Sequence, residues 1–224
     1  MNWIDFEFSP IMGEKLTAKN TLKLDFTAAN SELKFLNLVD TEEFDRYVFG
    51  KLKGKNKKYG IGGYLENRAI YSRSEVFATT EADFRNIHLG IDIWTKAGVS
   101  VYAPMDGKVH SFQDNVGFGN YGPTIILEHD LAGKKLFSLY GHLFRSDLEN
   151  LEIGKEIKSG DLLCNVGPYP ENGDWPPHLH FQLMWDLGEN SGDYPGVAAE
   201  KDLEFYRKNC PDPNLILKFN IDSI

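Results

Sequence analysis

The sequence predicts a mainly β protein: an antiparallel, barrel-like or sandwich core between an N-terminal extension and a short helical C-terminal tail. Three observations carry this prediction. From about Ile70 onward, short runs of β-prone residues alternate with turn residues. The pair Asp106-Gly107, which is typical of tight hairpins, separates two of these runs. Hydrophobic residues make up 42% of the 224 residues and aromatic residues 13%, which is enough to bury a core and excludes a wholly disordered chain.

Residues 1–75 are predicted to form an extension of mixed structure that packs on the core. Thr41, followed by Glu42 and Glu43, predicts a helix start, because acidic side chains are favoured at the positive end of a helix dipole. The stretch Lys51–Lys58 (KLKGKNKK) comes next. Its five lysines predict a solvated loop.

Residues 76–190 are predicted to form the β domain, and residues 191–224 a tail. The β runs include VSVYAP, GKVHSF, TIILEH, KLFSLYGHL and HLHFQLMW. The Asp-Gly pair at 106–107 lies between the first two runs and predicts a hairpin turn. Residues 98–109 and 154–166 share a glycine, alternating apolar residues and a turn, which indicates one hairpin motif used twice. In the tail, AAEKDLEFYRK predicts a helix that the following prolines end.

The charge balance argues against two classes of partner. Lysine and arginine together number 24, aspartate and glutamate 33, and the net charge is −9. An acidic surface repels nucleic-acid phosphates and anionic membranes. No hydrophobic run is longer than three residues, so no bilayer-spanning segment is expected. We therefore expect neither nucleic acid nor membrane as a partner.

The first residues and the cysteines predict a cytoplasmic location. The start, MNWIDFEFSP, has neither the basic nor the apolar region of a signal peptide. The two cysteines, Cys164 and Cys210, are too few for a disulfide framework and are expected to be reduced thiols. Export by a non-standard route is left open.

Three short motifs carry histidines in patterns that suggest a metal site. The first runs from His88 to Asp92 (HLGID) and offers an imidazole and a carboxylate, both good zinc ligands. Its residues favour extended chain over helix. On a straight strand the two side chains would lie roughly 13 Å apart, so the chain must bend, and Gly90 permits a bend.

The second motif is HLH, with His178 and His180 two residues apart. In a strand these two side chains share one face, and the apolar residues at 179, 181 and 183 share the other. A buried imidazole pair is costly without a partner, and a metal ion would supply one. The third motif, YGHL, carries His142. It supports a functional site only if the fold brings it close to the other two motifs.

Together the three motifs resemble the lysostaphin/LytM-type zinc metallopeptidases, peptidase family M23. The family pattern is H-x-x-x-D, then a histidine in a Tyr-x-His-Leu-like segment, then H-x-H. Here these read HLGID, YGHL and HLH in the same order. The resemblance covers residues Asn86–Trp185, under half of the chain, and implies the lysostaphin-type fold for the β domain. The segments GGYLENR and GDWPPHLHFQ resemble those of a subgroup of the family with intracellular members.

The resemblance implies one zinc ion per chain, bound by His88, Asp92 and His180. It implies that His142 and His178 are not ligands but face the bound water, and we expect them to serve as acid and base on zinc-activated water. The implied activity is hydrolysis of peptide bonds. The family's substrates are glycyl or D-amino-acid-containing peptides of peptidoglycan, so a peptide or peptidoglycan-derived substrate is the expected partner. All five positions hold the expected residue.

Four further residues are weaker candidates for contact with substrate. Trp175 precedes the His-x-His strand and would either line the substrate groove or anchor a loop. Tyr64, Glu66 and Arg68 lie in GGYLENR and would either contact substrate or form a salt-bridged loop.

Three alternatives to a peptidase share some of these sequence features. VYAPMDGKV and IKSGDLL look like the two halves of a lipoyl or biotinyl carrier domain, but no Met-Lys-Met turn presents a carrier lysine. A closed structural zinc site usually has four cysteine or histidine ligands, whereas this chain supplies three ligands and two further histidines. A zinc-loaded module of the same fold, which binds peptide or glycan without cutting it, is the main remaining alternative.

Overall fold

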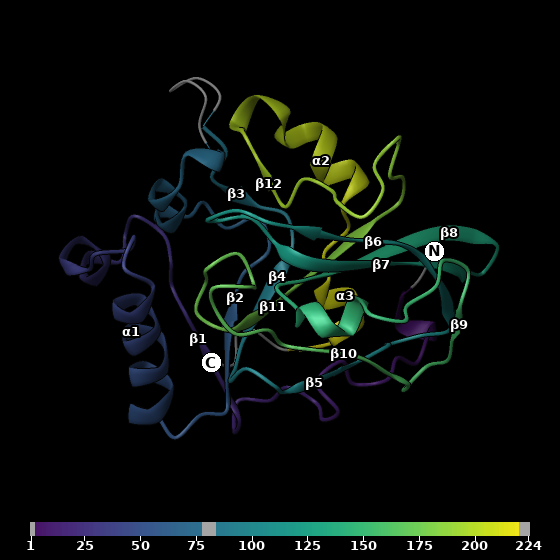
Figure 1. Cartoon of the computed structure of the whole chain (residues 1–224), viewed down its shortest axis with the longest axis horizontal. Helices are drawn as coiled ribbons and strands as arrows, with labels where there is room; N and C mark the ends of the chain where they lie inside the picture. The colour runs from purple at the N-terminus through teal and green to yellow at the C-terminus, as the bar shows by residue number, and fades with distance from the viewer. Residues whose placement is uncertain (1–2, 78–83, 220–224) are drawn as a thin grey trace.

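An eight-stranded sheet organises the chain, of which the computed structural model describes residues 3–77 and 84–219 (Figure 1). The strand order across the sheet is β1-β2-β4-β11-β8-β7-β6-β9. Neighbouring strands are antiparallel except for β1 and β2. In that order the strands are Thr21–Lys23, Tyr59–Gly62, Ile91–Trp94, His178–Met184, Lys134–Gly141, Gly122–Leu131, Gly107–Asn115 and Glu156–Ile157. The predicted mainly β fold class is confirmed.

Two short strand pairs complete the β structure. β5 (Ser100–Tyr102) pairs with β10 (Leu162–Asn165), and β3 (Ile87–His88) pairs with β12 (Val197–Ala198). The largest hydrophobic cluster joins buried side chains of β5 and β10 to one face of the large sheet, including Leu179 of β11. Both cysteines are buried and free, as predicted.

The predicted hairpin at residues 106–107 is wrong, although the chain bends just before it. β5 pairs with β10, whereas β6 pairs with β7 and β9. The echoing segments 98–109 and 154–166 therefore do not form one hairpin each. They pair with each other, so that the first strand of each segment lies beside the second strand of the other. A local turn signal shows that two strands are separated, not that they are hydrogen-bonded to each other.

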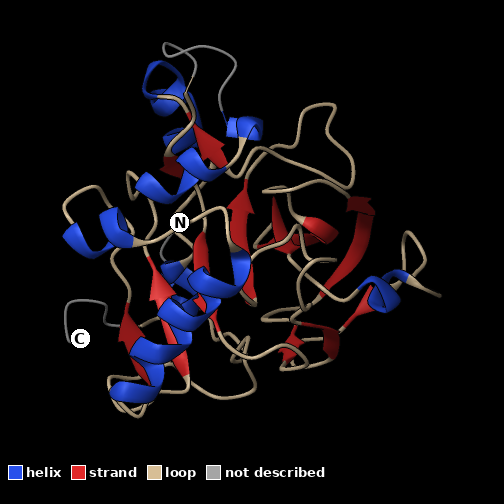
Figure 2. Cartoon of the chain, turned by 60° about the vertical axis from the view of Figure 1, so that its left-hand side comes forward, coloured by secondary structure: helices blue, strands red, loops and turns tan. Residues whose placement is uncertain are grey.

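The longest helix, α1 (Thr41–Gly54), lies beside the β1 end of the sheet (Figure 2). Asp40 caps it by accepting a hydrogen bond from the Glu43 N–H at 3.0 Å. The buried side chains of α1 belong to a second hydrophobic cluster, which also contains Trp94 of β4. The helix start expected at Thr41 is confirmed.

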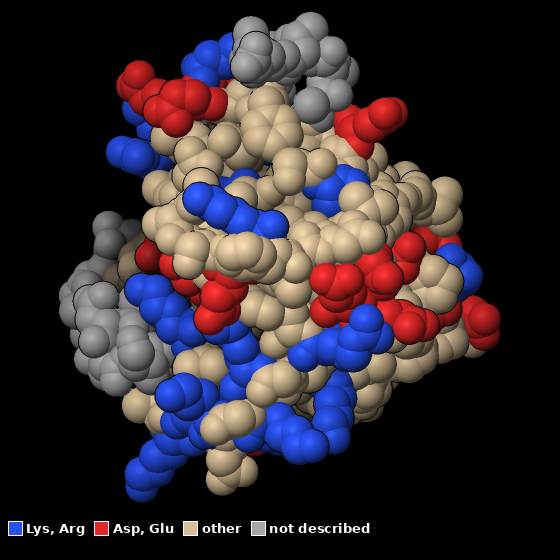
Figure 3. All heavy atoms as spheres, turned by 90° about the vertical axis from the view of Figure 1, so that its left-hand side faces the viewer, with Lys and Arg blue, Asp and Glu red and all other residues tan. Residues whose placement is uncertain are grey.

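The loop predicted for Lys51–Lys58 is wrong in its first half, because α1 continues to Gly54. Lys51 and Lys53 lie in the last helical turn, where positive charge is favoured by the helix dipole. Figure 3 faces the α1 side and shows Lys and Arg side chains gathered toward the end of the molecule at which this helix ends.

The two ends of the chain attach differently to the core. In the N-terminal extension, β1 and β2 continue the large sheet next to β4. The predicted helical tail is confirmed and carries α2 (Leu203–Asn209) and α3 (Asn214–Leu217). The domain boundaries at residues 75 and 190 stay predictions. Short 3-10 turns occupy Trp3–Asp5, Ser31–Phe35, Ala69–Arg73, Glu75–Phe77, Arg145–Leu148 and Glu200–Asp202. Within residues 3–77 and 84–219, no helix combines the length and apolar character needed to cross a membrane.

Candidate active site

Two neighbouring strands, β4 and β11, bring Asp92, His178 and His180 together. Their antiparallel register sets His180 opposite Asp92 and His178 opposite Trp94. Side chains alternate along a strand, and the largest hydrophobic cluster takes the residues at 91 and 93 of β4 and at 179, 181 and 183 of β11. The two histidines therefore lie on the opposite face, as the alternation in the sequence predicts.

The bend predicted at Gly90 separates β3 from β4 and lets His88 approach Asp92. The Nε2 atom of His88 lies 3.2 Å from Oδ1 of Asp92. Gly90 is also required by close packing, because a β-carbon at this position would lie 2.7 Å from the ring of His180. A larger residue would push that ring out of place.

His142 joins the group from the residue that follows β8. Its φ of +64° lies in the left-handed region, which is costly for a residue with a β-carbon and tends to occur at functional positions. Its ring centroid lies 4.2 Å from that of His178. The fold thus brings all three histidine motifs together, so His142 of the YGHL motif belongs to the same site.

Hydrogen bonds define which ring nitrogen lacks a proton in two of these histidines. Nδ1 of His88 lies 3.1 Å from the carbonyl oxygen of Gly63, so it donates there and Nε2 carries a lone pair. Nε2 of His180 lies 2.9 Å from Oε1 of Gln182. The Gln182 amide is oriented by donating to the Pro195 carbonyl at 3.1 Å. His180 therefore donates through Nε2, and its Nδ1 carries the lone pair.

Three unprotonated donor atoms consequently meet at one point: Nε2 of His88, Nδ1 of His180 and Oδ1 of Asp92. Their separations are 2.9, 3.0 and 3.2 Å, and all three side chains are buried. Lone pairs this close repel one another unless a cation lies between them. A tetrahedral zinc ion with bonds of about 2.0 Å sets its ligands roughly 3.3 Å apart. The donor set and its spacing therefore fit zinc.

The ionisation states also suit a metal. Burial, with Arg68 nearby, lowers the pKa of His88 to about 3, so this imidazole is neutral at ordinary pH. Burial alone would raise the pKa of Asp92, but His88, Arg68 and His178 outweigh it and hold that pKa well below the usual range. A neutral imidazole and an ionised carboxylate are the forms that bind metal.

His142 and His178 lie outside the group of three donor atoms, and each keeps an unprotonated Nε2. Nδ1 of His142 donates to the Asn172 carbonyl and Nδ1 of His178 to the Pro176 carbonyl, both at 2.8 Å. Burial lowers the pKa of His178 to about 4 and that of His142 well below its ordinary value. Both rings are therefore neutral near pH 7, and each can accept a proton at Nε2.

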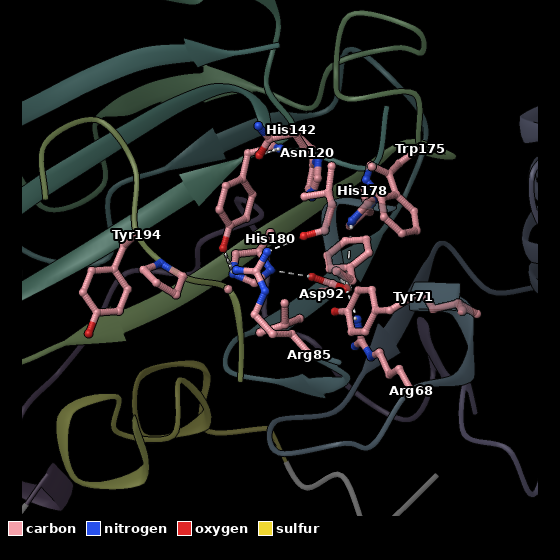
Figure 4. Close-up of a pocket in the computed structure, with 18 of the residues that line it drawn as sticks. Arg68, Tyr71, Arg85, Asp92, Asn120, His142, Trp175, His178, His180 and Tyr194 are labelled. Atoms are coloured by element: carbon pink, nitrogen blue, oxygen red, sulfur yellow. Dashed lines mark hydrogen bonds and ion pairs between the residues drawn. The ribbon is translucent and has the colours of Figure 1, made fainter. Parts of the chain in front are cut away.

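A cavity of about 260 Å³ opens onto this group (Figure 4). Its floor includes Asp92 and the histidines at 142, 178 and 180. Figure 4 shows Arg68 and Tyr71 beside Asp92, with Trp175 near His178. Further walls come from residues before 86 and from the segment 190–197. The cavity thus combines the core sheet with parts of both flanking regions.

The weaker substrate candidates separate into two groups. Trp175 and Arg68 line the cavity. Tyr64 and Glu66 are not among the residues that line it: the Tyr64 hydroxyl donates to the Cys210 carbonyl at 2.5 Å, and Glu66 accepts from Arg68 Nε at 2.8 Å.

Gln182, Tyr71 and Arg85 are among the residues of the site that the sequence did not reveal. Gln182, which orients His180, lies on the same face of β11, and strand alternation could have found it. Tyr71 and Arg85 line the cavity from the segment before β3. Nothing local marks them, because they reach the cavity through tertiary packing.

Comparison with known proteins places this geometry in a family. Residues 86–192 match the model described as peptidase family M23. Residues 86–192 therefore form a domain of peptidase family M23, called the M23 domain below. All five histidine and aspartate positions discussed above lie within the matched residues.

The M23 domain also has a relative of known name. The chain is 26% identical over 132 residues to the L-Ala--D-Glu endopeptidase of Bacillus subtilis (strain 168), a match that covers 55% of this chain and 38% of that protein. The chain therefore spans well under half of the length of this relative.

Two solved structures are similar to the M23 domain and its surroundings. The catalytic domain of the antimicrobial peptidase lysostaphin from Staphylococcus simulans matches with a TM-score of 0.45 and 21% identity, covering 71% of this chain and 92% of that one. A zinc containing peptidase from Vibrio cholerae matches with a TM-score of 0.39 and 24% identity, covering 55% and 32% of the two chains.

Proposed function

We propose that the M23 domain is a zinc-dependent peptidase, with His88, Asp92 and His180 as ligands and with His142 and His178 as acid–base residues. The observation that carries the proposal is the meeting of three unprotonated donor atoms beside two neutral histidines whose Nε2 atoms are free. Three protein ligands leave a position open, as in catalytic rather than structural zinc sites. The family match supports peptidase chemistry independently.

The protein's own part in the reaction is to bind, orient and move protons. Zinc held by these ligands would supply Lewis-acid activation of water and of the scissile carbonyl. His178 accepts one proton of the attacking water at Nε2, and its imidazolium stabilises the developing oxyanion and returns that proton to the leaving amine. His142, whose ring centroid lies 4.2 Å from that of His178, shares this acid–base role through its own Nε2. Burial keeps both rings neutral beforehand, which is the state that a base requires.

We further propose peptides of peptidoglycan type as substrates, with glycyl or D-amino-acid-containing bonds. The name of the Bacillus subtilis relative, an L-Ala--D-Glu endopeptidase, supports this class because its bond includes a D residue. The cavity of about 260 Å³ is close to the lower end of the range of about 300–1,000 Å³ for small-ligand sites. It suits a short peptide segment rather than a folded protein.

Mass spectrometry of a peptide panel tests the proposed function. The panel holds oligoglycine, muropeptides with D-amino-acid cross-links and ordinary L-peptides, each incubated with zinc-loaded protein and with chelated protein. We expect products from at least one peptide with the zinc-loaded protein alone. Equal cleavage after chelation would contradict zinc dependence. Stoichiometric zinc binding without any cleavage would instead favour the zinc-loaded binding module.

A further inference from the structure

We propose that Arg68 is a positioning residue of the metal centre: it holds one carboxylate oxygen of Asp92, so that Asp92 offers the other oxygen alone to the metal. The inference rests on the zinc site proposed above. It gives the GGYLENR segment, which lies outside the residues that match the family model, a role in positioning a metal ligand.

The two oxygens of Asp92 have different partners. Oδ1 lies 3.2 Å from His88 Nε2 and 3.0 Å from His180 Nδ1, so it belongs to the donor group. Oδ2 accepts a short hydrogen bond from Nη1 of Arg68. Nε2 of His178 lies 3.9 Å from Oδ2, too far for a hydrogen bond. Oδ1 of Asp92 thus faces the proposed metal position, whereas Oδ2 is bound by Arg68.

The guanidinium of Arg68 is itself held in one orientation. Its Nε donates to Glu66 at 2.8 Å and its Nη1 donates to the Tyr71 hydroxyl at 3.1 Å. The side chain is 1% exposed, and its charge lies 5.8 Å from the ring centroids of Phe26 and Tyr71. A β-carbon on Gly62 would lie 2.5 Å from Nη2, so the guanidinium packs closely against the backbone at Gly62. Arg68 therefore presents a fixed donor to Asp92.

The backbone ties this arginine to a proposed ligand. The Leu65 N–H donates to the His88 carbonyl at 2.8 Å, and the His88 N–H donates to the Glu66 carbonyl at 3.0 Å. The Arg68 N–H donates to the Asn86 carbonyl at 2.8 Å. The segment 65–68 therefore runs along β3, and Arg68 cannot shift without disturbing the strand that carries His88.

The consequence concerns the number of open positions at the metal. A carboxylate that binds through both oxygens would occupy a position needed for water or substrate. With Oδ2 engaged by Arg68, Asp92 supplies one donor atom and the site keeps three protein donors. The rigid, planar fork of an arginine suits this task, and a lysine would supply charge without the same geometry.

The test compares Arg68→Met with Arg73→Met. Arg73 is a second buried arginine in the same region, 5% exposed, whose hydrogen bonds go to Thr41 and Asp174 rather than to a proposed ligand. Zinc affinity is measured by competition with a chromophoric chelator, without substrate. We expect Arg68→Met to bind zinc about 10–100-fold more weakly than wild type, and Arg73→Met to bind it within about twofold of wild type while unfolding at a lower temperature. Equal zinc affinity in Arg68→Met and wild type, or an equal loss in both variants, would overturn the inference.

Arg68→Lys keeps the inference falsifiable if Arg68→Met does not fold. Cobalt(II) in place of zinc reports coordination through its visible absorption. We expect Arg68→Lys to give weaker cobalt bands than wild type, as the coordination number rises when Oδ2 is released. A cobalt spectrum and a zinc affinity identical to those of wild type would overturn the inference. Because neither readout involves cleavage, failure to find a substrate would count against the proposed peptidase activity alone.

Discussion

Replacing His178 by alanine is expected to lower the cleavage rate by about 10²–10⁴-fold, the usual contribution of a general acid or base, while the protein retains its zinc. The reason is that Nε2 of His178 is free to take a proton, whereas its Nδ1 is engaged with Pro176. The hydrogen bonds that orient the three proposed ligands come from Gly63, Gln182 and Arg68, so loss of this ring leaves those bonds in place. Rates are measured on the best peptide of the panel, and bound zinc is measured on the same samples.

His110→Ala is the matched control for this variant. His110 is half-buried and bonds to Ser111 at 2.9 Å, and it does not line the cavity. We expect its rate to stay within about twofold of wild type. A His178→Ala rate equal to that of His110→Ala, with zinc bound in both, would show that the base has been assigned to the wrong residue.

Replacing His88 by alanine is expected to remove the metal itself. The change deletes one of three donor atoms. Loss of a residue that only hydrogen-bonds a ligand typically weakens metal binding by about 10–100-fold, so we expect His88→Ala to weaken zinc binding by more than that. Cleavage should be lost with it. Wild type should also unfold at a lower temperature after chelation, because a metal that binds the folded state stabilises it, and His88→Ala should not respond to chelator. Stoichiometric zinc at wild-type affinity in His88→Ala would contradict the proposed ligand set.

The sequence was most informative where chemistry and strand periodicity coincide. The two-residue spacing of His178 and His180 determines a shared face in any strand, and the structure has them on one face of β11. The glycine in HLGID predicted a bend because the His–Asp spacing is too long for one ion on a straight strand. Both inferences depend on distances of only a few residues, over which backbone geometry alone decides the answer.

Partners distant in the chain could not be predicted in the same way. The Asp-Gly pair at 106–107 signals a turn, but the strands on either side pair with β10 and β9 from a segment some fifty residues later. The lysines after Gly50 favour solvent, yet burial of the opposite face of α1 extends the helix through them. The sequence allows Arg68 to be either a substrate contact or part of a salt-bridged loop, and only the fold reveals that Asp92 accepts a hydrogen bond from it.

The most direct measurement is a crystal structure of the zinc-loaded protein with anomalous diffraction data on both sides of the zinc absorption edge. It separates the roles of the five clustered residues at the level of atoms. We predict one anomalous peak, bonded to Nε2 of His88, Nδ1 of His180 and one oxygen of Asp92, with His142 and His178 unbonded to it. A peak elsewhere, or one coordinated by His142 or His178, would contradict an open catalytic site with three ligands and two free histidines.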